Sequence, residues 1–159
     1  MLFASLTHAP DGSGREVAAL VTSHCGPVAE AERAMQPLKQ FGPPILDAVG
    51  PMTYCELNRM LDANYPKGAF NYWKSNFLTE LSDGAIATMI ECFARCPTPM
   101  GQLLLEHIHG AAARVGAGDT AFVHRQEGYN FLILAQWTQA SDTSRSISWA
   151  RATYERMRP

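Results

Sequence analysis

Alternating apolar residues near the start of the chain predict a β-hairpin. Residues Leu2–His8 are largely apolar, and Val17, Ala19 and Val21 then recur at every second position. This is the period of a strand that buries one face. A Pro-Asp-Gly-Ser-Gly turn at 10–14 separates the two segments. We therefore expect strands at 2–8 and 16–24 that pair with each other.

The pattern then changes to a helical period, which predicts helices at 28–40 and 53–63. Pro37 lies inside the first and should distort its last turn. The second begins with a capping box, in which the Thr53 hydroxyl can accept from the backbone of Glu56 and the Glu56 carboxylate can reach back. The residues that this second helix is expected to bury are Leu57, Met60 and Leu61.

Two further helices are predicted later in the chain. Ser82 is a suitable N-cap for a helix that ends before Pro97, and residues 141–157 show another helical stripe. The apolar stripes are formed by Ile86, Met89, Ile90 and Phe93 in the first helix and by Ile147, Ala150, Tyr154 and Met157 in the second.

The remaining apolar segments predict strands at 70–78, 102–109 and 129–137, with a possible short strand at 110–115. Residues 129–137 are apolar almost throughout, which is typical of a central strand buried on both faces. Helices lie between groups of strands. The order favours an α+β fold, with an antiparallel or mixed sheet and helices packed mainly on one face. We expect one domain over residues 1–159.

Composition narrows the possible partners. Charged residues make up 18% of the chain, below the roughly 25% of an average domain, so part of the surface is expected to meet something other than water. The net charge is −2 and no basic run exists, which argues against nucleic acid and membrane partners. The first residues lack a signal-peptide pattern and no apolar run is long enough to span a membrane, so we expect a cytoplasmic protein.

Motifs that would hold a cofactor or a metal are missing. The sequence has no Gly-rich dinucleotide loop, P-loop lysine or nucleophile elbow. Its four cysteines match no common zinc spacing, and Cys92 and Cys96 are interpreted as small packed residues on one helical face. We expect the isolated chain to bind neither FAD nor a metal.

An ordered set of short motifs spans almost the whole chain. The set ends with a Leu-Glu strand, a glycine, a Thr-x-Phe-x-His-Arg turn and a strand that closes on Trp137. In this order it resembles the substrate-binding domain of berberine-bridge-enzyme-like, FAD-linked oxidases. The motifs are His24-Cys25-Gly26, Gly42-Pro43-Pro44, Gly50-Pro51-Met52-Thr53-Tyr54, Asn71-Tyr72-Trp73-Lys74-Ser75, Glu106 to Gly110, Thr120 to Arg125 and Tyr129 to Trp137.

The resemblance implies a sheet that covers the flavin ring and lines the substrate pocket. The family's FAD-binding domain and its C-terminal segment have no counterpart here, so FAD is expected only from a missing domain or from an FAD-bearing partner. The chain would then be the substrate-binding module of an FAD-dependent oxidoreductase that acts on a small molecule. Some relatives carry a catalytic carboxylate on the last strand, but the matching position is Leu132, which cannot act as a base. The catalytic residues stay unassigned.

Candidate pocket residues lie on three predicted strands and one loop. Asn130 and Gln136 share a strand face with Leu132 and could shape a pocket. Tyr72 and Lys74 share another face and could point at a substrate, although a lysine at the sheet rim is the favoured interpretation.

Two charged segments leave alternatives open. Glu106 lies among apolar residues, so it is either functional or, as we favour, held by an arginine such as Arg125 or Arg114, or by backbone donors. His124 and Arg125 form a loop pair that could bind an anion, or Arg125 could fasten the loop to backbone carbonyls. His107 and His109 lie two apart on a strand and could form a metal pair, but surface or pocket histidines are the favoured interpretation.

The second face of the sheet predicts self-association. The predicted helices can cover one face, and Leu132 and Leu134 would then lie exposed on the other. We therefore expect a homodimer with twofold symmetry through that face. The alternative function is a stand-alone homodimeric ligand-binding or structural protein without redox activity, and a small metal-dependent enzyme built on the two histidines is a third possibility.

Overall fold

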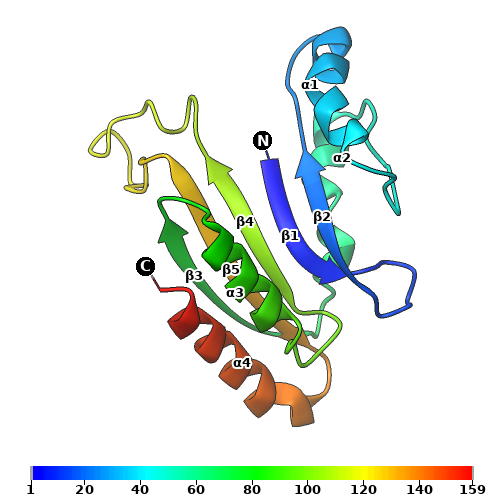
Figure 1. The fold of residues 1–159 in the computed structure, drawn as a ribbon, viewed down its shortest axis with the longest axis vertical. Coiled ribbons are helices and arrows are strands. Elements are labelled where there is room, and N and C mark those ends of the chain that lie inside the picture. The colour runs from blue at the N-terminus through cyan, green and yellow to red at the C-terminus, as the bar shows by residue number, and fades with distance from the viewer. Residues whose placement is uncertain (1, 159) are drawn as a thin grey trace.

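The computed structural model describes residues 2–158, and its strands form one five-stranded antiparallel sheet (Figure 1). The order across the sheet is β2-β1-β4-β5-β3. The predicted hairpin is formed by the first two strands, which pair in antiparallel register. The strands are β1 (Leu2–His8), β2 (Glu16–Thr22), β3 (Phe70–Leu78), β4 (Gln102–Ile108) and β5 (Gly128–Trp137).

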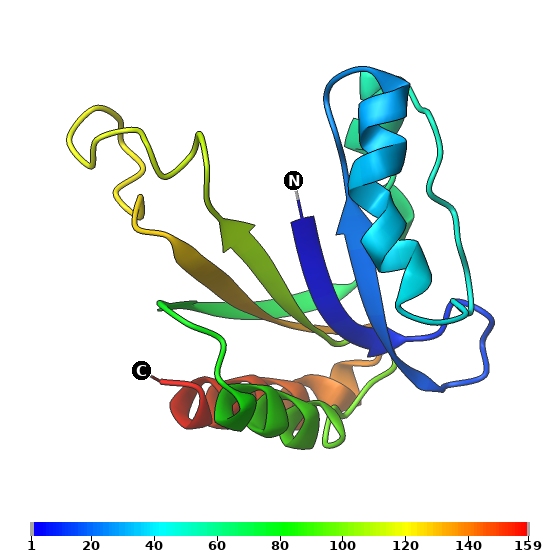
Figure 2. The same cartoon turned by 45° about the horizontal axis from the view of Figure 1, so that its top comes forward.

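Two helices cover one face of this sheet, as predicted for the α+β fold. Helices α3 (Asp83–Phe93) and α4 (Thr143–Arg156) lie side by side below the strands in Figure 2. The Trp149 indole N–H in α4 donates to the Cys92 carbonyl in α3 at 2.8 Å and joins the two helices. The buried core between helices and sheet is formed by Met89, Cys92, Phe93, Leu103, Leu105, Phe131, Ile133, Ala135, Trp137, Trp149, Ala150 and Met157.

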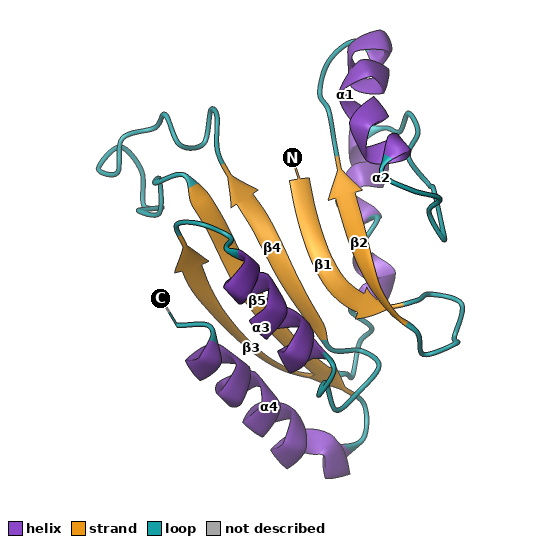
Figure 3. Cartoon of the chain, in the orientation of Figure 1, coloured by secondary structure: helices purple, strands orange, loops and turns teal. Residues whose placement is uncertain are grey.

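The segment between β2 and β3, residues 23–69, forms an arm whose helices α1 and α2 lie beside β2 (Figure 3), and its last residues run to β3 at the opposite edge of the sheet. It contains α1 (Val28–Gln40), α2 (Tyr54–Arg59) and the short 3₁₀ helix η1 (Asp62–Asn64). The predicted capping box of α2 is present, with hydrogen bonds of 2.6 and 3.2 Å between Thr53 and Glu56. No arm residue is buried. The prediction that this helix runs to about residue 63 and buries Leu57, Met60 and Leu61 is wrong. Helix α2 ends at Arg59, Leu57 is only half-buried, and Met60 and Leu61 are 41% and 36% exposed.

Two further expectations differ from the structure. Residues 110–115 form a turn and coil rather than a strand, and β4 already ends at Ile108. In α3, Met89 and Phe93 are buried, but Ile86 and Ile90 remain 39% and 53% exposed. The sheet covers only one side of α3, so half of the predicted stripe faces away from the core. No helix within residues 2–158 is long and apolar enough to cross a membrane.

Candidate functional site

The face of the sheet that points away from α3 and α4, which we call the second face, carries half of the candidate residues, namely Glu106, Asn130, Leu132 and Gln136. Strand alternation directs Phe131 and Ile133 of β5 into the core, so Asn130 and Leu132 point to the opposite side. Antiparallel register then fixes their neighbours on β4. The cross-strand pairs on the second face are Glu106 with Asn130, Leu104 with Leu132 and Gln102 with Leu134.

Glu106 and Asn130 form the polar centre of this face. The Asn130 amide donates to Glu106 Oε2 at 2.7 Å, and both side chains are half-buried. The side-chain oxygen of Asn130, Oδ1, is buried and has no hydrogen-bond partner within the described residues. Glu106 forms no ion pair with a described residue, so the expected arginine partner is wrong. A side-chain amide takes that place, because Asn130 lies directly across the strand pair.

Glu106 is also the only titratable side chain that the five strands direct to the second face. The other positions on β4 and β5 are amides and aliphatic residues, and β1, β2 and β3 add aliphatic, aromatic, hydroxyl and amide side chains. A half-buried carboxylate with one oxygen held by an amide can accept a hydrogen bond or a proton at its other oxygen.

The loop between β4 and β5 brings His124 to the end of the sheet where the Glu106–Asn130 pair lies. The His124 ring stacks on Phe77 with 3.7 Å between centroids and 11° between planes, and Phe77 is the register partner of Asn130. Arg125 holds the loop in this position by donating to the carbonyls of Phe122 and Ala112 at 3.1 and 3.3 Å. Arg125 thus fastens the loop, which leaves His124 as the loop's contribution to the site.

The other end of the second face is closed. The Gln136 side-chain amide donates to the Asn71 side-chain oxygen at 3.0 Å, and the Thr98 hydroxyl donates to the backbone carbonyl of Gln136 at 2.6 Å. Leu134 and Gln136 are each only 3% exposed. The expectation that Leu134 lies exposed is therefore wrong, because the chain itself covers this part of the face. Leu132 is half-buried and lies between the closed end and the Glu106–Asn130 pair.

Tyr72 and Lys74 lie on the helix side of the sheet and do not join this site. The Lys74 ammonium lies 3.9 Å from the centre of the Tyr154 ring, and Arg151 Nε donates to the Tyr72 hydroxyl at 3.2 Å. The hydrogen bond from Arg151, together with the charges of Arg151 and Lys74, lowers the pKa of the Tyr72 phenol. Both residues therefore pack β3 against α4.

Sequence reasoning missed the residues of β3 that do face the site. Phe77 supports His124, Asn71 holds Gln136, and Trp73 meets Tyr65 edge to face at 5.4 Å. The two-residue period of β3 already separated Asn71, Trp73 and Phe77 from Tyr72 and Lys74. Which of the two sets turns towards the helices depends on the register with β5.

The N-termini of helices α1 to α4 are capped or lie beside acidic residues. The box of Thr53 and Glu56 caps α2, and the Ser82 hydroxyl caps α3 by accepting from Ala85 at 3.2 Å. Glu30 lies in the first turn of α1 and Asp142 precedes α4, and these negative charges would repel a phosphate. Within residues 2–158 no group of three or more His, Cys, Asp or Glu is placed to hold a metal ion.

Solved structures and a curated protein that are similar to this chain are FAD-linked oxidoreductases or berberine-bridge-enzyme-like proteins. The berberine bridge enzyme from Eschscholzia californica matches with a TM-score of 0.78 and 18% identity, covering 99% of this chain and 34% of that one. A berberine-bridge-enzyme-like protein from Arabidopsis thaliana matches with a TM-score of 0.75 and 19% identity, covering 98% and 35%. An FAD-linked oxidoreductase from Dictyostelium discoideum is 21% identical over 127 residues, 79% of this chain and 28% of the relative. No family model matches the sequence.

The chain thus has the fold of the corresponding part of berberine-bridge-enzyme-like, FAD-linked oxidases, and spans about a third of the length of these relatives. The resemblance deduced from the sequence motifs is confirmed at the level of the fold.

Proposed function

We propose that this chain is the substrate-side module of an FAD-linked oxidoreductase and that its second face forms one wall of a substrate pocket. The wall would close against an FAD-bearing region on the same or another polypeptide. The observation that carries the proposal is the half-buried Glu106–Asn130 pair at 2.7 Å on a sheet face that no helix of the α3–α4 layer covers. The shared fold with FAD-linked enzymes supports it.

The second face has the mixture of groups that a small-molecule pocket needs. Leu104 and Leu132 form a half-buried apolar floor, and the free oxygens of Glu106 and Asn130 lie at its edge. The free Glu106 oxygen accepts hydrogen bonds and would orient a substrate hydroxyl or amine, while the Asn130 oxygen is buried and could accept only after the amide moves. FAD, when bound to the other region, would supply the hydride acceptor. The role of this chain would be to position the substrate and to exclude water.

The arm is suited to hold the two regions together. It exposes large apolar side chains in a molecule with few charges, and such surfaces mark interfaces more often than free surface. Phe41 is 95% exposed and Tyr54 is 78% exposed. The exposed arm residues are Val28, Leu38, Phe41, Ile45, Leu46, Val49, Met52, Tyr54, Met60, Leu61 and Tyr65.

The test begins with the genomic DNA that flanks the coding sequence. An FAD-binding domain, in frame or in a neighbouring gene, would be expressed together with this chain and purified through a tag on this chain. We expect a yellow complex with a flavin spectrum. Leu132→Glu should abolish the complex or substrate turnover while far-UV circular dichroism stays unchanged. Absence of such a domain, or a flavin protein that does not associate with this chain, would refute the proposal.

The isolated chain is expected to bind no FAD tightly, since its helix N-termini are capped or carry acidic residues. Gel filtration after incubation with FAD measures this. Flavin that stays with the isolated chain in stoichiometric amount would contradict the assignment of FAD binding to the other region.

The second candidate function is a stand-alone homodimeric ligand-binding or structural protein. The exposed apolar residues of the arm favour this second function, because a second copy of the chain could cover them in place of an FAD-bearing region. Sedimentation at micromolar concentration separates the two candidates. A stable dimer that persists in the presence of the FAD-bearing region would favour this one.

A further inference from the structure

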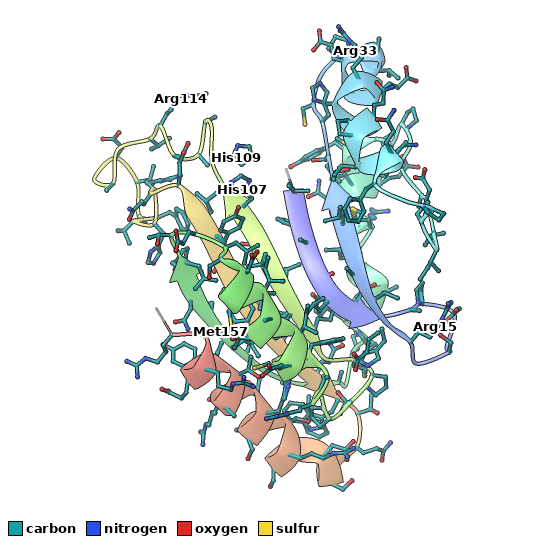
Figure 4. All side chains as sticks on the ribbon, viewed as in Figure 1. Arg15, Arg33, His107, His109, Arg114 and Met157 are labelled. Carbon is teal, nitrogen blue, oxygen red and sulfur yellow. The ribbon has the colours of Figure 1, made fainter. Side chains whose placement is uncertain are left out.

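The end of β4 holds two histidines that take no part in the proposed substrate site. Alternation places His107 on the helix side of the sheet with Leu105, and His109 follows two residues later, just beyond the strand. Their rings stack with 4.3 Å between centroids and 27° between planes. Figure 4 labels both residues at this end of β4. Glu106 points to the opposite face, so the pair is separate from the second-face site.

The two imidazoles are held close together and their nitrogens are free. The Tyr129 ring also stacks on His107, with 4.9 Å between centroids and 16° between planes. Within residues 2–158 no ring nitrogen of either histidine forms a hydrogen bond or an ion pair. His109 is exposed and His107 is half-buried, so a solute can reach the pair.

We propose that His107 and His109 form a two-histidine binding site for a divalent transition metal ion, with Cu²⁺ bound more tightly than Ni²⁺ or Zn²⁺. Imidazole nitrogen suits these three ions, and their affinities for a given nitrogen site are highest for Cu²⁺. Metal–nitrogen bonds of roughly 2.0–2.1 Å place two adjacent ligand nitrogens about 2.9 Å apart in a tetragonal Cu²⁺ site and about 3.3 Å apart in a tetrahedral Zn²⁺ site. The two rings stack with 4.3 Å between centroids, so each imidazole would have to turn about its side-chain bonds to direct one nitrogen at a shared ion.

One acidic side chain lies close to the pair. Ile108 pairs with Gly128, so Glu127 follows one step beyond the last register pair, and its negative charge acts on His107. Within residues 2–158 no third His, Cys, Asp or Glu is in ligating position, and water would complete the coordination.

The test is a Cu²⁺ titration at pH 7.5 in a Cys25→Ser, Cys55→Ser background, because both thiols are exposed and would bind the same ions. Burial raises the pKa of Cys96 to about 11, so its thiolate does not compete. Calorimetry and electron paramagnetic resonance should report one ion per chain, ligated by two nitrogens. His107→Asn and His109→Asn should each weaken binding at least about tenfold, since even outer-shell partners are worth that much.

His24→Asn is the matched control, because His24 lies on the arm beside Glu30 at 3.9 Å and away from the pair. It should leave the affinity unchanged. Circular dichroism would confirm that all three variants fold. The proposal is overturned if the parent binds Cu²⁺ no more tightly than either single variant, which is the behaviour of separate surface imidazoles. It is also overturned if His24→Asn reduces binding as much as the other two changes.

Discussion

The hydrogen bond between Glu106 and Asn130 gives the sharpest test of the site, through a double-mutant cycle on stability. The variants are Glu106→Ala, Asn130→Ala and the double change. Hydrogen bonds to charged groups contribute roughly 1.5–3 kcal/mol when buried. The 2.7 Å contact joins half-buried groups, so solvent screens part of this value. We expect a coupling free energy of about 1–2 kcal/mol.

The two single variants should lose different amounts of stability, because they leave different groups without a partner. Asn130→Ala leaves a half-buried carboxylate without its donor, which should cost about 2 kcal/mol. Glu106→Ala removes the carboxylate itself, so no charge is left without a donor, and the loss of stability should be smaller. The double variant should be less destabilised than the sum of the two. For a chain of this size each kcal/mol corresponds to about 2–4 °C in Tm.

Urea unfolding followed by tryptophan fluorescence measures all four proteins. A control cycle pairs Glu106 with Gln136, which contact different partners, and should be additive within about 0.5 kcal/mol. Additivity of the Glu106 and Asn130 changes would refute the reasoning. The pair would then not be a fixed part of the site.

Three further predictions follow from contacts elsewhere in the fold. Leu134→Ala should cost about 3 kcal/mol in urea unfolding, because Leu134 is 3% exposed; a loss below 1 kcal/mol would show that the second face is open there. Arg151→Gln should raise the pKa of Tyr72 towards that of free tyrosine, because the Arg151 hydrogen bond lowers it; an unchanged ultraviolet titration at 295 nm would contradict the contact. Gly128→Ala should cost at least about 2 kcal/mol, since the new Cβ would collide with the carbonyl of the last β3 residue, whereas Gly118→Ala, with open space around it, should stay within about 0.5 kcal/mol. Equal effects of the two glycine changes would contradict the packing of β5 on β3.

The local pattern of the sequence was sufficient for most secondary structure. The two-residue period of β2, the capping box of α2 and the Ser82 cap of α3 each depend on neighbours within a few residues, so these elements begin where they were predicted, although β2 and α2 end earlier, at Thr22 and Arg59. The order of the motifs was also sufficient for the resemblance to FAD-linked oxidases, which the fold confirms.

Only the tertiary structure decided which residues form the site. Strand alternation divides each strand into two faces, but the antiparallel register across β3, β4 and β5 determines which face meets the helices. That register placed Tyr72 against α4 and put Glu106 opposite Asn130 rather than beside an arginine. The burial of Leu134 and the exposure of the arm likewise depend on what packs against them. Contacts between residues distant in sequence leave no local pattern, and for this reason the sequence alone could name candidates but could not assemble them.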